Sequence, residues 1–214
     1  MKNCPEASFD ILYLLMISQK KYDELHRTEI TLLSYLSLLL SIYDGHKSNE
    51  WVYHFSHHKF GGPFSSEINN ELDLLIRKGT VISSTGEDFY TISNKAGTVI
   101  TTGLFNEFMQ LDRFKWRIKY LDASISACLT KSLPIVSRAI NEEPELSLAQ
   151  EHGIKTTLHS KDSNSLYEQF GALKNAIGDF RNDIFIPASI WIDYLLLLSE
   201  KKTGEPNDRP NTSK

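Results

Sequence analysis

One run of apolar residues, at positions 30–43 (ITLLSYLSLLLSIY), restricts the possible folds more than any other feature of the sequence. Its apolar side chains would fall on nearly every face of an α-helix, and such a helix is stable only when neighbouring elements surround it. Thr28 and Glu29 supply an N-cap and a first-turn acid, and Asp44-Gly45 ends the run. We therefore predict a helix over residues 28–43 that forms the buried centre of its domain.

The composition is that of an ordinary globular chain, because 41% of the 214 residues are hydrophobic and 23% are charged. The formal net charge is −4, whereas a domain that depends on phosphate contacts is usually basic. Cys4 and Cys128 have no companion cysteine or histidine at a ligand spacing, so neither a disulfide framework nor a zinc site is predicted. The composition therefore disfavours an independent nucleic-acid-binding protein.

The sequence also bears on localisation. The apolar stretches at residues 30–43 and 184–198 are shorter than the roughly 20 residues that a membrane span needs. Residues 1–6 carry one lysine followed by an acid, which is not the layout of a signal peptide. We expect a cytoplasmic protein with no membrane partner.

The first hundred residues follow the order of a winged helix. A short helix over residues 9–17, capped by Ser8, precedes the central helix. A third helix over residues 65–78, capped by Ser65, follows a Gly-Gly-Pro turn. Two β-prone runs, at residues 81–84 and 89–92, then flank a turn and predict a hairpin. Three helices before a hairpin place the helix over residues 65–78 in the recognition-helix position, with the hairpin as the wing.

The second half is predicted to be helical. Residues 104–133 are expected to form one long helix, with an apolar seam at spacings of three and four residues for packing on another helix. Shorter helices follow, and residues 203–214 form a polar tail that we expect to be disordered. The predicted fold is mainly α with a small β-hairpin wing. A winged-helix domain (residues 1–100) precedes an α-helical domain (residues 101–202).

The polar face of the predicted recognition helix is acidic. Between residues 61 and 79 there are two bases, Arg77 and Lys78, against three acids, Glu67, Glu71 and Asp73. Acids there would repel phosphates, and the turn of the hairpin adds Glu87-Asp88. The pattern favours a winged helix that binds protein, with Glu67 and Glu71 as candidate partner contacts.

One basic run offers a possible contact with a DNA backbone. Arg113, Lys115, Arg117 and Lys119 alternate with aromatic residues within eight positions. The alternative interpretation is that these bases form the solvated flank of the long helix, because its seam passes through Phe114 in the same run.

No catalytic signature is present. His54, His57 and His58 cluster on a predicted strand, but a metal site needs imidazoles on one side with an acid nearby, so histidines beside aromatics are the alternative. The Gly61–Ser65 turn opens a helix whose amides could bind an anion, but it lacks the spacing and lysine of a phosphate loop. We therefore expect no enzyme, no cofactor and no metal.

The last helix, over residues 187–202, carries apolar residues on nearly every face. Such a helix is either surrounded by its own chain or shared with a partner. We predict a partner interface at Trp191, Leu195 and Leu198, and a large internal core is the alternative.

Three motifs of the first half resemble a known family. They are FGGPFSSEI at residues 60–68, LDLLIRKG at residues 72–79 and YTISNKAG at residues 90–97. This pattern is similar to that of small bacterial winged-helix proteins from toxin–antitoxin and phage-defence loci. The helical half, with SLP at residues 132–134 and AINEEP at residues 139–144, resembles the middle component of ABC-three-component systems, which overlap with Lamassu-type anti-phage systems.

The resemblance implies a non-catalytic adaptor. Such a middle component would join an SMC-like ATPase, which senses DNA, to an effector subunit such as a nuclease, and DNA contact would occur only within the complex. The alternative is a winged-helix DNA-binding regulator or antitoxin, and an enzyme with an unrecognised site is a weaker third hypothesis.

Overall fold

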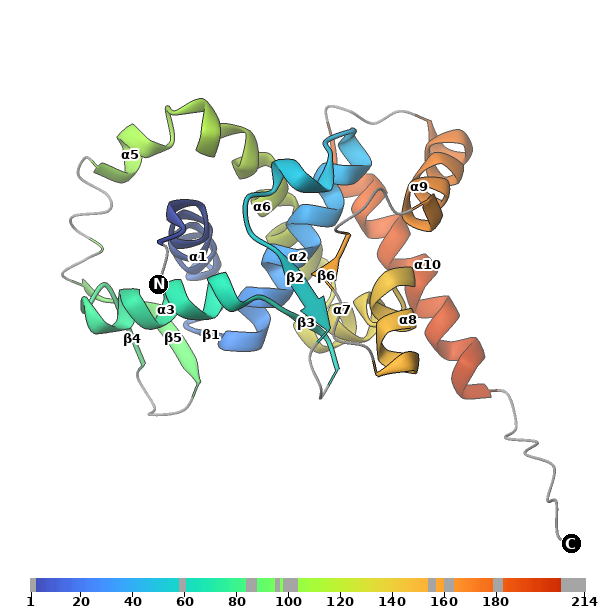
Figure 1. The fold of residues 1–214 in the computed structure, drawn as a ribbon, viewed down its shortest axis with the longest axis horizontal. Coiled ribbons are helices and arrows are strands. Elements are labelled where there is room, and N and C mark those ends of the chain that lie inside the picture. The colour runs from blue at the N-terminus through green and yellow to red at the C-terminus, as the bar shows by residue number, and fades with distance from the viewer. Residues whose placement is uncertain are drawn as a thin grey trace, which may run out of the picture.

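The apolar run at residues 30–43 forms the centre of the molecule, as predicted. In the computed structural model it lies in helix α2 (Arg27–Asp44), and every side chain from Ile30 to Tyr43 is buried. Figure 1 shows α2 crossing the middle of the fold between the N-terminal elements and the C-terminal helices. The structure describes residues 3–57, 61–83, 88–94, 97, 104–153, 157–159, 164–178 and 183–204.

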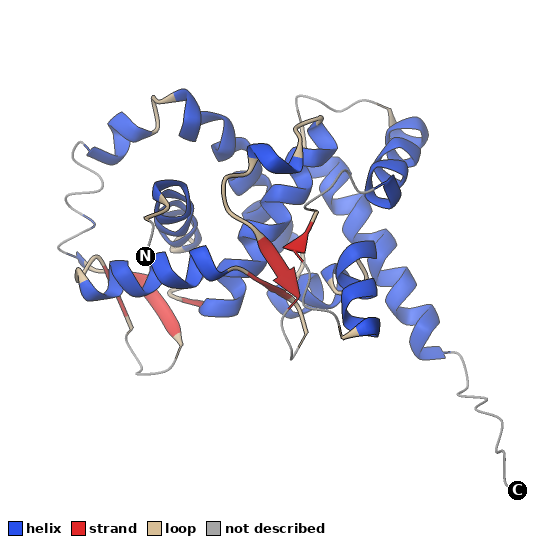
Figure 2. Ribbon diagram, in the orientation of Figure 1, coloured by secondary structure: helices blue, strands red, loops and turns tan. Residues whose placement is uncertain are grey.

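The described part of the chain is mainly helical, with two small antiparallel sheets (Figure 2). Its helices are α1 (Pro5–Ser18), α2, the 3-10 turn η1 (Ser48–Glu50), α3 (Ser66–Arg77), α5 (Leu104–Phe108), α6 (Asp112–Thr130), α7 (Leu133–Ile140), α8 (Pro144–His152), α9 (Asn164–Ile177) and α10 (Phe185–Gly204). Its strands are β1 (Leu25–His26), β2 (Phe55–His57), β3 (Pro63–Phe64), β4 (Val81–Ile82), β5 (Phe89–Ile92) and β6 (Thr157–Leu158).

Two of the predicted helix caps are wrong and two are confirmed. α1 begins four residues before the predicted start, with Pro5 in its first turn, so Ser8 is not its cap. His26 rather than Thr28 caps α2, because its Nδ1 accepts the Thr28 amide while its own amide donates to Glu29. Ser65 caps α3 by accepting the Ile68 amide. α2 ends at Gly45, whose φ of 108° is a left-handed conformation that glycine adopts without strain.

The predicted hairpin is present, and a strand that the sequence did not reveal completes its sheet. Val81 pairs with Ile92 in the antiparallel β4–β5 pair. β1, which lies between α1 and α2, pairs antiparallel with the outer side of β5 through Leu25 and Tyr90, so the sheet order is β1-β5-β4. Two residues are too few to show an alternating pattern, which is why β1 was not predicted.

The second sheet joins the two halves of the chain. β2 pairs with β3 across the Gly-Gly-Pro turn and also with β6, giving the order β3-β2-β6. β6 lies between α8 and α9 in the chain. Buried apolar side chains from both halves belong to one continuous core. The predicted domain boundary near residue 100 lies outside the described residues.

The long helix predicted over residues 104–133 is two helices, α5 and α6. Leu111, between them, has an extended backbone with ψ of 130°, which interrupts the helical path. The break lets Phe105 and Phe114 reach the same ring, at 5.1 and 4.8 Å from Phe9 between centroids. In a straight helix these two residues would be separated by about 13 Å along the axis, at 1.5 Å per residue.

The predicted last helix is present as α10, and its two ends differ from the prediction. α10 starts two residues earlier and ends two residues later than predicted, so it includes the first two residues of the expected tail. The rest of that tail, residues 205–214, lies outside the described residues. α10 packs against α6 and α7, and its buried side chains complete the core around α2.

Candidate functional site

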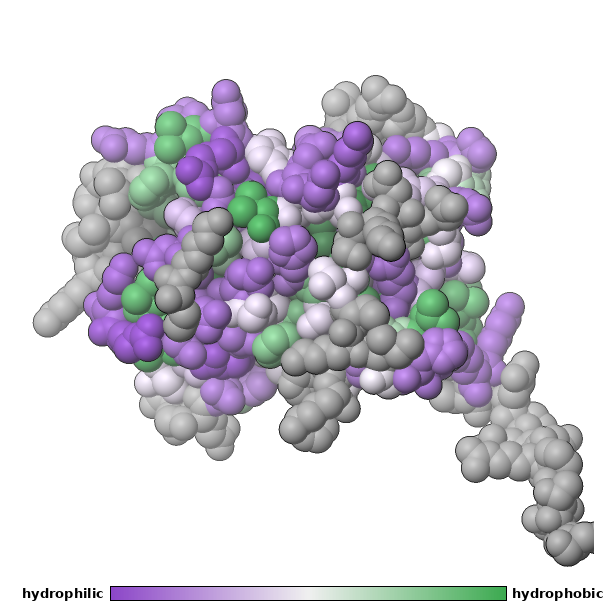
Figure 3. All heavy atoms as spheres, viewed as in Figure 1, coloured by the Kyte–Doolittle hydropathy of each residue, from purple (hydrophilic) through white to green (hydrophobic). Residues whose placement is uncertain are grey.

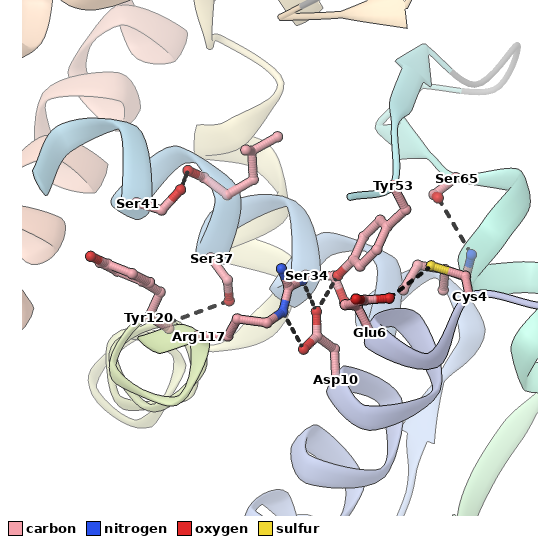
Figure 4. A network of polar contacts seen from close by, with 12 residues as sticks. Cys4, Glu6, Asp10, Ser34, Ser37, Ser41, Tyr53, Ser65, Arg117 and Tyr120 are labelled. Carbon is pink, nitrogen blue, oxygen red and sulfur yellow. Dashed lines mark hydrogen bonds and ion pairs between the residues drawn. The ribbon is translucent and has the colours of Figure 1, made fainter. Parts of the chain in front are cut away.

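The structure assigns Arg117, a predicted DNA contact, to the core. Its side chain is 0% exposed and pairs with Asp10 of α1, which is also 0% exposed. The guanidinium Nε donates to Asp10 Oδ1 at 2.9 Å, and its carbon lies 3.6 Å above the Trp51 ring. Tyr53 donates to Asp10 Oδ2 at 2.5 Å (Figure 4). A side chain enclosed in this way cannot reach a phosphate, so the prediction is wrong for Arg117.

This cluster has a defined protonation state. Burial lowers the pKa of Arg117, but the charge and hydrogen bonds of Asp10 and Tyr53 raise it by more, so its net pKa is raised. Burial together with the charge of Asp10 holds the pKa of Tyr53 well above its usual value. Arg117 is therefore charged, and its contacts join α1, α6 and the segment before β2.

The other three bases of the run remain at the surface. Arg113 pairs with the buried carboxylate of Glu6, and Lys119 pairs with Asp44 at 2.9 Å. Lys115 is exposed. The run is thus divided by the helical period: one base is enclosed, two contact acids of their own chain, and Lys115 faces solvent.

The two acids predicted as partner contacts on α3 have separate roles. Glu71 is buried and binds the N-terminal end of α1, where it accepts the Cys4 amide at 2.7 Å and the Ser8 hydroxyl at 2.6 Å. It is therefore an internal contact, and the prediction is wrong for Glu71. Glu67 is partly exposed and lies 3.6 Å from His54 Nδ1, so it remains available to a partner.

The exposed face of α3 is less acidic than the sequence suggested. Its exposed side chains are Ser66, Asn70, Asp73 and Arg77. Arg27 donates to Asp73 at 2.8 Å and also approaches Asp88 and the hydroxyl of Tyr90, which neutralises much of the acidity between α3 and the hairpin. Glu87, the other predicted acid of the wing tip, lies outside the described residues.

The predicted interface on α10 names the wrong face of that helix. Trp191 is 2% exposed and Leu195 is 0% exposed, so both belong to the core, while Leu198 is half-buried against it. The exposed apolar side chains of α10 lie on the opposite face: they are Ile186, Ile190, Tyr194 and Leu197. The alternative prediction, a large internal core, holds for Trp191 and Leu195.

The histidine cluster gives no metal site in the part that the structure describes. His54 is exposed beside Glu67 and His57 is half-buried on β2, while His58 lies outside the described residues. Among the described residues no group of three or more histidine, cysteine or carboxylate side chains is arranged to hold an ion. This finding leaves the described histidines as neighbours of aromatic and acidic side chains.

The Gly-Gly-Pro turn borders a cavity of about 550 Å³ between the start of α2 and α7. Gly61 and Gly62 have φ of 94° and 80°, which explains why glycine occupies both positions. Arg27 and Glu29 line the cavity, but the Arg27 guanidinium is directed to Asp73 and Tyr90 and Glu29 caps α2. Both charged side chains are therefore engaged by contacts within the chain itself.

Sequence reasoning missed a second buried polar cluster. Tyr35 donates to Glu143 at 2.8 Å and lies 2.9 Å from His159 Nε2, and Glu145 is 3.3 Å from His159 Nδ1. Burial lowers the pKa of His159, but Glu143 and Glu145 raise it by more. Burial raises the pKa of Glu143, but its hydrogen bond and ion pair with His159 lower it by more, so the net pKa is lowered. The cluster anchors β6 to α2 and α8.

No protein-family model, curated protein or solved structure matches this chain. Across the described residues no helix is both long and apolar enough to cross a membrane.

Proposed function

We propose that this chain is a non-catalytic adaptor subunit of a bacterial anti-phage defence complex. In this proposal it is the middle component of a Lamassu-type, ABC-three-component system and links an SMC-like ATPase to a nuclease-type effector. The observation that carries the proposal is the arrangement of α3. In the proposed winged helix α3 takes the recognition position, and from Ser66 to Ile76 it lacks the basic residues that reading DNA requires.

The element order supports the winged helix. A helix, a short strand, two helices and a hairpin follow one another as α1, β1, α2, α3 and β4–β5, and β1 pairs with the second hairpin strand. One departure is the insertion between α2 and α3, where η1, β2 and β3 lie. β2 pairs with β3 and with β6 instead of joining the first sheet. The insertion therefore attaches the winged-helix elements to the second half of the chain.

The chemistry of α3 supports a protein partner. From Ser66 to Ile76 the helix has no basic residue, and its exposed positions there are Ser66, Asn70 and Asp73. Base edges in the major groove are read mainly by Arg, Lys, Asn and Gln, and phosphates are held mainly by Arg and Lys. A small polar surface with one neutralised acid is suited to hydrogen bonding with another protein at the polar part of an interface.

The test is co-purification with the SMC-like ATPase and the effector encoded beside such a subunit. The chain is expected to bring both proteins through affinity and size-exclusion steps. Asn70→Arg and Ser66→Arg place bulky cations on the exposed face of α3 and are expected to release one partner, whereas Lys115→Ala on α6 serves as the matched surface control. If neither protein co-purifies with the wild-type chain, the adaptor proposal is rejected.

A second candidate function, a DNA-binding regulator, is favoured by one observation. The exposed end of α3 presents Arg77 and Lys78, and the acid one turn before them, Asp73, is already paired with Arg27. Salt-sensitive binding of duplex DNA that is lost in Arg77→Glu/Lys78→Glu would support it. Retention of binding in that variant and loss in Lys115→Glu would instead place DNA on α6.

A further inference from the structure

α10 carries a row of exposed apolar side chains that the described part of the chain leaves uncovered. The α10 row consists of Ile186, Ile190, Tyr194 and Leu197, whose exposed fractions are 36%, 38%, 45% and 57%. Their spacings of four, four and three residues keep them on one face of the helix, opposite the face that buries Trp191 and Leu195. Four large apolar residues in one line indicate a contact surface rather than scattered exposure.

One flank of the row is bordered by contacts with α6. Lys131 joins the end of α6 to one flank of α10 through Ser189 and Asp193, so polar contacts border the row on that side. In Figure 3 apolar surface is also visible at the lower right, where Figure 1 shows α8 and the C-terminal half of α10. The row itself is about 17 Å long, at 1.5 Å per residue.

The segment that follows α10 does not have the chemistry to cover the row. Residues 205–214 have the sequence EPNDRPNTSK, in which no residue is a large aliphatic or aromatic side chain. This segment therefore supplies no large apolar side chain to the row, and the arrangement of α10 itself indicates which side chains would cover it.

We propose that the α10 row packs against the α10 row of a second copy, with the two helices antiparallel. A two-fold interface is self-complementary, so every residue must meet a suitable partner from the same surface. With the axis at the level of Ile192, Ile190 of each copy lies opposite Tyr194 of the other, because each is two residues from the axis. Ile186 then lies opposite Leu198, whose side chain is half-buried.

The charges at the two ends of α10 fit the same register. Asp183 is exposed at the N-terminal end, where it accepts the Phe185 amide, and Lys201 is exposed in the last turn. Each is nine residues from Ile192, so an antiparallel pair places the carboxylate of one copy beside the ammonium of the other at both ends. Antiparallel packing also brings the positive end of each helix dipole near the negative end of its neighbour.

The surface that the two α10 rows would bury is small for a protein interface. One pair of helices and the flanking residues would bury less than the roughly 1,200–2,000 Å² of a standard interface. The dimer is therefore weak, with a dissociation constant on the order of micromolar. Nothing in this proposal depends on the adaptor function, because the row and its charges belong to the chain alone.

The first experiment measures the oligomeric state of the purified full-length chain. Sedimentation velocity over roughly 1–200 μM is expected to show a concentration-dependent shift from monomer to dimer, as weak interfaces do. Ile190→Glu and Leu197→Glu are expected to weaken the dimer at least about tenfold, because burying one such side chain contributes about that factor. Val52→Glu, at an apolar side chain that is 53% exposed beside η1, is the matched control and leaves the dimer intact.

The second experiment tests the antiparallel register. Asp183→Lys and Lys201→Asp each place like charges at both ends and weaken the dimer, whereas the double variant restores opposite charges and recovers the wild-type affinity. The proposal is overturned if the wild-type chain stays monomeric up to about 200 μM, a concentration on the order of the weakest specific contacts. The proposal is also overturned if the chain stays monomeric and the α10 row binds a different protein. A dimer that survives Ile190→Glu, or a double variant that is not rescued, overturns it equally.

Discussion

The sharpest test of the structure is Arg117→Ala. The substitution removes the only cation that contacts Asp10 among the described residues and leaves a carboxylate with 0% exposure and one remaining donor, Tyr53. Breaking a buried ion pair by removing one partner costs about 3–5 kcal/mol, because the other charge stays buried without compensation. The free energy of unfolding of natural domains is about 5–15 kcal/mol, so a loss of that size is a large fraction of the total.

The assay is urea unfolding followed by circular dichroism at pH 7. Lys115→Ala, two residues away on the same helix and exposed, is the matched control and is expected to change the free energy of unfolding by less than about 0.5 kcal/mol. Arg117→Met combined with Asp10→Leu and Tyr53→Phe removes every polar group of the cluster together. That variant is expected to recover most of the loss, because apolar replacement of a buried pair is often close to neutral.

The reasoning fails if Arg117→Ala and Lys115→Ala destabilise the protein equally. That result would mean that Arg117 is solvated in solution, and it would make a DNA contact at this position tenable again. A large loss in the single variant with no recovery in the triple variant would instead show that packing on Trp51, rather than the unpaired charge, dominates the effect.

Three further predictions concern stability. The pKa of His159 is raised by its flanking carboxylates, so its protonated form stabilises the fold below the unfolded pKa of about 6.5, and this contribution is lost as pH rises through the folded pKa. Urea midpoints should therefore fall from pH 6 to 9, and the fall should be smaller in His159→Asn; a flat wild-type profile would contradict this. Gly45→Ala should destabilise by about 1–2 kcal/mol because φ is 108°, whereas Gly171→Ala, at a helical position with open space, should stabilise by about 0.5–1 kcal/mol in thermal melts. Glu71→Ala should cost about 1–3 kcal/mol and speed amide exchange at Cys4, whose amide loses its acceptor; unchanged exchange would refute the contact.

Several elements could be predicted because their signals are local. The cap at Ser65, the left-handed Gly45 and the β-prone runs around the hairpin act within a few residues, and each has the predicted role in the structure. The central position of α2 was predictable for a related reason. A helix that is apolar on every face is stable only when other elements surround it, so its burial can be predicted without knowing which elements those are.

Other features depend on residues that are distant in the sequence. Arg117 resembles a surface base within a basic run until Asp10, 107 positions away, is placed beside it. His159 lies in a polar segment that gives no sign of its contact with Tyr35, 124 positions away. The two-residue strands β1 and β6 form only because β5 and β2 offer free edges to them.

α10 shows the division most clearly. The sequence by itself determined that this helix is apolar nearly all round, and it left open whether its own chain surrounds the helix or a partner shares it. Only the tertiary structure decided that Trp191 and Leu195 face the core while Ile190 and Tyr194 face outward, because the direction of burial is set by α6 and α7. Helical periodicity gives the angles between side chains on one helix, and the packing of other helices decides which of those angles points inward.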